Sequence, residues 1–62
     1  MEFKQRLMDE KQQLDEKLSK LGAFIGTEKF ETVDPRQQEL LRGQYFIMQS
    51  YSDILERRLE IL

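Results

Sequence analysis

The ten residues from Gly26 to Pro35, GTEKFETVDP, decide the fold because they combine a helix stop with a helix start. Gly26 follows a stretch with helical periodicity. A Gly at that place typically ends a helix by adopting the left-handed conformation. Asp34 stands directly before Pro35, which predicts an N-capping carboxylate followed by a Pro at the first helical position. Gln37, three residues after Asp34, completes a capping-box pattern. The sequence therefore predicts one helix before this segment and another after it.

The expected elements are a helix over about residues 2–25, a connector over 26–33 and a second helix over about 35–61. Because the connector is short, we expect the helices to pack antiparallel. Phe30 and Val33, within the connector, are the expected plugs over the adjoining end of the hairpin. The fold class is all-α, a single two-helix hairpin domain with no internal repeat.

Apolar residues recur every three or four positions in both helices, which predicts one buried face on each. In the first helix the expected core column is Leu7, Leu14 and Leu21, widened by Leu18 and Ile25. In the second helix the expected core column is Leu41, Met48, Leu55 and Leu62, widened by Leu40, Ile47, Ile54 and Ile61.

A single core in a 62-residue chain is marginal, and small chains compensate with disulfides, metals or oligomerisation. The sequence contains neither Cys nor His, which excludes disulfides, thiolate–zinc sites and His-based catalysis. We therefore expect a homo-oligomer. Tyr45, Phe46 and Leu59 lie off the predicted seam, so a monomer would expose them, and they are the expected contacts with a partner.

Charge and hydropathy exclude several classes of protein. A net charge of −2 provides no basic field for duplex nucleic acid. No apolar run approaches the roughly 18–20 residues of a membrane span, and the first residues lack a signal-peptide core, so we expect a cytoplasmic protein. The carboxylates lack calcium-loop spacing and no nucleophile–base pair is present, so we expect no metal, no cofactor and no enzymatic activity.

Polar and aromatic residues follow each predicted seam at seven-residue intervals. The first helix carries Phe3, Glu10, Lys17 and Phe24, and the second carries Gln44, Tyr51 and Arg58. In an antiparallel hairpin, Phe3 should lie level with Arg58, Glu10 with Tyr51, and Lys17 with Gln44. These residues are called the polar stripe.

Two interpretations of the polar stripe remain open. Its members can pair with one another and set the register, as polar seam residues do in coiled coils. Alternatively, its cations and aromatic rings can line a groove for a phosphate-bearing ligand with flat bases. A surface for a partner protein is a third possibility.

The same residues carry a resemblance to a known family. The run Phe3-Lys4-Gln5-Arg6-Leu7, the column residues that follow it in the first helix, and Leu40-Leu41, Gln44, Met48, Tyr51, Leu55 and Arg58 resemble the helical-hairpin cyclic-nucleotide sponges of phages. That family blocks the CBASS and Thoeris immune systems of bacteria. The resemblance covers nearly the whole chain as spaced residues, without a continuous diagnostic motif.

The resemblance implies a hexamer that sequesters cyclic di- and trinucleotides between protomers without hydrolysing them, inside the infected bacterial cell. Phe3 would stack on a base, in a place where the family would be expected to have Tyr. Lys17 and Arg58 would bind phosphate, with Arg6 and Thr27 as weaker candidates, and Tyr51 would supply a second ring. The alternative function is a helical-hairpin interaction module that binds a host or phage protein through Tyr45, Phe46 and Leu59.

Overall fold

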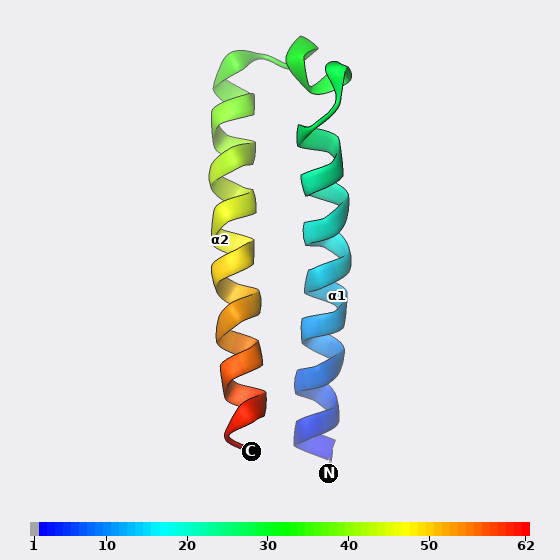
Figure 1. Ribbon diagram of the computed structural model, residues 1–62, viewed down its shortest axis with the longest axis vertical. Coiled ribbons are helices and arrows are strands. Elements are labelled where there is room, and N and C mark those ends of the chain that lie inside the picture. The colour runs from blue at the N-terminus through cyan, green and yellow to red at the C-terminus, as the bar shows by residue number, and fades with distance from the viewer. Residues whose placement is uncertain (1) are drawn as a thin grey trace.

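The computed structural model describes residues 2–62, which form two long antiparallel helices joined at one end (Figure 1). Helix α1 spans Glu2–Ile25, a short 3-10 helix η1 spans Glu28–Thr32, and helix α2 spans Pro35–Glu60. The hairpin measures 45 × 14 × 13 Å, and the start of α1 lies beside the end of α2 at the open end. The predicted all-α hairpin is confirmed, since residues 2–62 contain helices and no strand. No helix in this range is long and apolar enough to cross a membrane.

The turn after α1 differs from the prediction. Gly26 was expected in the left-handed conformation, yet no residue of 2–62 has a positive φ. The backbone N–H of Gly26 instead donates to the carbonyl of Ala23 at 3.2 Å, and Thr27 donates to Phe24 at 3.0 Å. These i→i−3 bonds tighten the last turn and satisfy its carbonyls, so the helix ends without a left-handed residue.

The start of α2 follows from its capping residues. The Asp34 carboxylate accepts from the backbone N–H of Arg36 at 2.9 Å, and Pro35 occupies the first turn. Arg36 also donates to Asp34 through its guanidinium, at 2.9 Å. The side-chain amide of Gln38 reaches back to the carbonyl of Val33 at 2.7 Å, which ties α2 to the connector. Asp34 is therefore the N-cap that the sequence predicts, although its carboxylate bonds to Arg36 and not to Gln37.

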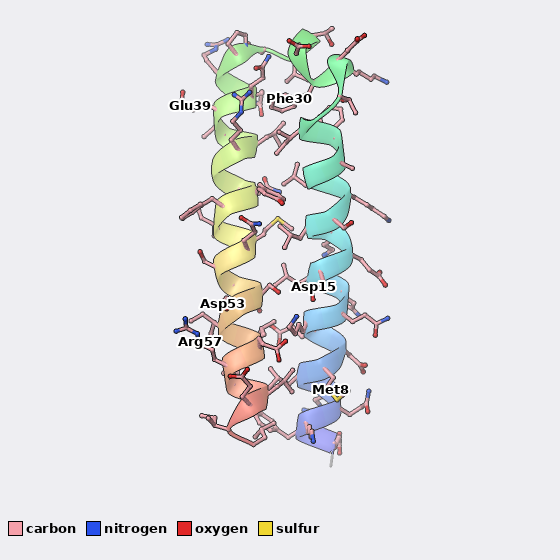
Figure 2. The ribbon with its side chains drawn as sticks, in the orientation of Figure 1. Met8, Asp15, Phe30, Glu39, Asp53 and Arg57 are labelled. Atoms are coloured by element: carbon pink, nitrogen blue, oxygen red, sulfur yellow. The ribbon has the colours of Figure 1, made fainter. Side chains whose placement is uncertain are left out.

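Three side chains are almost completely buried: Leu7 from α1, Phe30 from η1 and Leu55 from α2. Phe30 has 1% of its surface exposed and lies at the closed end of the hairpin (Figure 2). Its ring contacts Phe24 edge-on with centroids 5.6 Å apart, and the Arg42 guanidinium lies 5.0 Å above it. Phe30 is thus the plug that the sequence predicts, and Val33 beside it is half-buried.

The predicted core column of α2 is confirmed at Leu41, Met48 and Leu55, which are buried or half-buried, but the prediction of which residues widen it is wrong. The column expected to widen the seam is exposed: Leu40 66%, Ile47 67%, Ile54 50% and Ile61 86%, and Leu62 is 59% exposed. Helix α1 instead packs on a face of α2 that is called the closing face here and consists of Leu41, Tyr45, Met48, Ser52, Leu55 and Leu59, all buried or half-buried. The exposed column is called the free face and consists of Leu40, Ile47, Ile54 and Ile61.

Helical geometry explains this difference. Successive residues lie about 100° apart around an α-helix, so one neighbouring helix cannot cover both the Leu40 column and the Leu41 column. The column of Gln44, Tyr51 and Arg58 lies between these two, and packing against both would bury its polar groups at a cost. Tyr45 and Leu59 were expected to be exposed, but they complete the closing face and are half-buried. Only Phe46 of that predicted trio is exposed, at 68%.

A glycine of α1 makes room for a close contact with the closing face of α2. A Cβ atom built on Gly22 would lie 2.9 Å from Cε1 of Tyr45 and 3.2 Å from its hydroxyl oxygen. The absence of a side chain at Gly22 therefore makes room for the Tyr45 ring. The Tyr45 hydroxyl accepts a hydrogen bond from the side chain of Gln49 at 3.3 Å.

Candidate functional site

The polar stripe is anchored by one direct contact between the helices. The Tyr51 hydroxyl of α2 donates a hydrogen bond to the Glu10 carboxylate of α1. This is the pair that the antiparallel arrangement predicts, and it places the two columns of the stripe on the same flank of the hairpin. Tyr51 keeps 44% of its surface exposed, so its ring remains accessible beside the bond.

The other stripe residues do not pair across the seam in the same way. The Gln44 side-chain amide lies 3.8 Å from the Met48 sulfur of its own helix. Lys17 and Arg58 are exposed, and within residues 2–62 neither forms an ion pair with a carboxylate. The register-setting interpretation therefore holds for Glu10 and Tyr51, while two cations on the same flank keep their charge available to a ligand.

Phe3 and Arg6 occupy the first two turns of α1, at the open end. Phe3 is 54% exposed, which is a high exposure for a phenyl ring. The Arg6 guanidinium pairs with Glu2 at 2.5 Å, and both side chains are largely exposed. An exposed i,i+4 pair of this kind contributes little free energy, so an anionic ligand could replace Glu2 as the partner of Arg6 at low cost.

Thr27 lies at the opposite end of the hairpin from Phe3 and Arg58. Its hydroxyl donates to the carbonyl of Phe24 at 2.6 Å and accepts from the backbone N–H of Phe30 at 3.3 Å. Thr27 is the N-cap of η1, and both bonds serve the turn. A single hairpin therefore does not bring Thr27 together with the candidate residues at the open end.

A second polar cluster, on the other flank of the seam, was not predicted from the sequence. Lys11 of α1 contacts Asp15 at 2.7 Å and reaches Glu56 of α2 at 3.5 Å. Ser52 of α2 donates to Asp15 at 2.5 Å. These four residues are called the cross-helix cluster. The signal available in the sequence was the i,i+4 spacing of Lys11 with Asp15 and of Ser52 with Glu56, both next to apolar seam positions.

The cross-helix cluster changes the acidity of two of its members. The hydrogen bond from Lys11, followed by that from Ser52, lowers the pKa of the Asp15 carboxyl below its ordinary 3.8. The hydrogen bond to Asp15 in turn raises the pKa of Lys11, since the charged ammonium is the form that donates. Both shifts favour the ion pair that links the helices.

Two open hollows lie beside the cross-helix cluster. One, of about 470 Å³, is lined by Met8, Lys11, Gln12, Asp15, Glu16, Ser19 and Leu59. The other, of about 330 Å³, is lined by Lys11, Leu18, Gln49, Ser52, Asp53 and Glu56. In each hollow two carboxylates stand against the single cation Lys11, whereas the polar stripe offers exposed cations. Complementarity to an anion therefore favours the stripe over the hollows.

The groups that the polar stripe exposes are suited to binding a ligand. It combines an ammonium, a guanidinium and two accessible rings on an elongated surface, which suits phosphates and flat bases. Among residues 2–62, no group of three acidic side chains is placed to hold a metal ion. The fold and this surface together describe a small helical-hairpin protein with an exposed cationic and aromatic flank.

Comparison with known proteins identifies the family. The model of the Sequestin family matches residues 1–61, and the chain belongs to that family. An uncharacterized 7.5 kDa protein from the denB–rIIB intergenic region of Enterobacteria phage T4 is 39% identical over 57 residues. The aligned part covers 92% of this chain and 89% of the phage protein. No solved structure matches the chain significantly.

Proposed function

We propose that this chain is a phage immune-evasion protein that binds cyclic oligonucleotide second messengers between its protomers and holds them without cleavage. The family name indicates sequestration, and the similar protein of phage T4 indicates a phage setting. Removing the messenger would deprive CBASS-type or Thoeris effectors of their activator in the cytoplasm of the infected cell. The ligand class comes from the resemblance of the stripe residues to the cyclic-nucleotide sponges.

The observation that carries the proposal is the pair of exposed cations, Lys17 and Arg58, on the flank that also exposes Phe3 and Tyr51. A cyclic dinucleotide brings two phosphates and two flat bases. One hairpin offers few cations, but two symmetry-related copies would double the set and match the two-fold symmetry of such a ligand. Stacking of each base on an aromatic ring contributes about 1–3 kcal/mol.

Self-assembly is part of the proposal because the free face borders the polar stripe. A second copy packed on Ile47 and Ile54 would stand next to Tyr51 and Arg58, since these columns are neighbours on α2. A ligand on the stripe would then contact two chains at once. The resemblance makes a hexamer the expected assembly.

Isothermal titration calorimetry with a panel of cyclic di- and trinucleotides tests the proposal. We expect binding, and we expect chromatography of the ligand released by heat to show an intact nucleotide. Arg58→Ala should lose binding, whereas Arg57→Ala should keep it, because Arg57 already pairs with Asp53 at 3.2 Å and points away from α1 (Figure 2). Lys17→Ala should lose binding without loss of helicity. No binding across the panel would reject sequestration of these ligands, and a cleaved nucleotide would reject the absence of catalysis.

The alternative interaction module loses most of its surface. Two of its three residues, Tyr45 and Leu59, are half-buried against α1 in the closing face. Phe46 alone remains exposed for such a role.

A further inference from the structure

Helix α2 carries two apolar faces, and either has the spacing needed to close the hairpin. The closing face includes a hydroxyl and a phenol, from Ser52 and Tyr45. The central column of Leu41, Met48 and Leu55 can be widened on either side. The free face would add Leu40, Ile47, Ile54 and Ile61, which are more apolar than the Tyr45, Ser52 and Leu59 that the closing face adds. Hydrophobic burial alone would therefore favour packing the free face against α1. The hairpin uses the other face, so a different interaction must make the choice.

We propose that the cross-helix cluster and the contact between Gly22 and Tyr45 select which face of α2 closes the hairpin, and thereby leave the column of Leu40, Ile47, Ile54 and Ile61 exposed. Both features engage the closing face only. Lys11 and Asp15 find Glu56 and Ser52 there, at 3.5 Å and 2.5 Å. If α2 turned its free face inward, these partners would rotate away from α1.

The partial burial of Lys11 makes the cross-helix cluster favour one orientation of α2. The Lys11 side chain is only 21% exposed, and its ammonium lies 2.7 Å from the Asp15 carboxylate and 3.5 Å from the Glu56 carboxylate. A half-buried charge that loses its partners is penalised more than an exposed one. The inverted packing would take Glu56 away from Lys11 and Ser52 away from Asp15, and this loss opposes the gain from burying isoleucine.

The fit of the Tyr45 ring against Gly22 also favours the closing face. Gly22 leaves a space that the Tyr45 ring fills, and the ring would meet a Cβ atom at 2.9 Å if any other residue stood there. The free face has no aromatic residue in its column of Leu40, Ile47, Ile54 and Ile61, so turning it inward would leave the space at Gly22 without this ring. The two features lie about two to three helical turns apart along α1, and together they orient α2 along much of its length.

Reversing one charge tests the selection. In Lys11→Glu, the new carboxylate would stand beside Asp15 and Glu56, which repels the closing face. We expect isotope-filtered NOEs within one chain to appear between the δ1 methyl groups of Ile47 or Ile54 and leucine methyls of α1. The wild-type chain should lack these NOEs. The double variant Lys11→Glu/Glu56→Lys restores an opposite-charge pair and should lose them again.

Arg57→Glu is the matched control, because it makes the same change in charge on the side of α2 that points away from α1 (Figure 2). It should keep the wild-type NOEs. If Lys11→Glu does not fold, Lys11→Gln/Gly22→Ala replaces it, since this variant weakens both features without adding a repulsive charge. A folded variant of either kind with the wild-type pattern would overturn the proposal, as would failure of Glu56→Lys to restore that pattern.

Discussion

Replacing Leu55 with Ala should be among the most damaging single changes in the hairpin. Leu55 has no exposed surface and lies on the closing face opposite α1. The substitution removes three carbon atoms, worth about 2.4 kcal/mol at roughly 0.8 kcal/mol for each buried CH₂. The remaining cavity adds to this loss, and Leu→Ala changes in protein cores cost about 2–5 kcal/mol. Domains of this size have about 3–9 kcal/mol of total stability at roughly 0.05–0.15 kcal/mol per residue, so Leu55→Ala should unfold a large part of the population.

Urea denaturation followed by far-ultraviolet circular dichroism measures this effect, and Ile47→Ala provides the comparison. Ile47 is 67% exposed in the single hairpin, so its truncation should be mild at low protein concentration. If copies cover the free face, the cost of Ile47→Ala should grow as concentration rises, because association then contributes to stability. A Leu55→Ala cost below about 1 kcal/mol would refute the assignment of the core.

Three further predictions concern other parts of the hairpin. Gly22→Ala should stabilise the chain by about 1 kcal/mol through helix propensity, but only when Tyr45 is also truncated. A double-mutant cycle of these two changes, measured by urea denaturation, would detect the coupling, and additive effects would contradict the close contact. Because folding lowers the pKa of Asp15, the carboxylate stabilises the folded chain above pH 3.8, and this contribution is lost as the pH falls below that value. The urea midpoint of Asp15→Asn should therefore depend less steeply on pH in this range than that of the wild type. An unchanged slope would count against the interaction with Lys11. Phe30→Ala should cost about 3–5 kcal/mol, and a small effect on the thermal midpoint would show that the closed end is not part of the core.

Local signals predicted the elements well because their causes are local. Asp34 caps α2 through its own side chain, as its place before Pro35 indicates. Phe30 was the only large apolar residue in the segment between the helices that could cover the closed end, and it is 1% exposed. The conformation of Gly26 was predicted wrongly because a short 3-10 turn and a left-handed residue satisfy the same carbonyls, and the sequence does not distinguish them.

The orientation of α2 could not be predicted by counting apolar residues. The Leu40 column is more apolar than the column of Tyr45, Ser52 and Leu59, so hydropathy favours the wrong face. The correct choice depends on contacts between residues far apart in the chain, such as Ser52 with Asp15. Each member of such a pair looks like an ordinary surface residue until the partner is known.

The candidate site depends on the same orientation. With the closing face against α1, Tyr51 reaches Glu10 across one flank, and Arg58 remains exposed on that flank, one column away from Ile54. With the free face turned inward, the isoleucines would pack against α1. A second copy would then have to use Leu41, Met48 and Leu55, on the other side of the Tyr51 and Arg58 column, which changes how the cations of two chains face each other. A ligand that needs charges from two chains could then bind only weakly. Variants that invert α2 should therefore lose ligand binding even when Lys17 and Arg58 are intact, whereas Lys11→Glu/Glu56→Lys should recover it. Calorimetry on variants whose NOE patterns are known would separate this effect from the loss of a direct contact, and full ligand affinity in a chain with inverted α2 would refute the link between hairpin closure and the site.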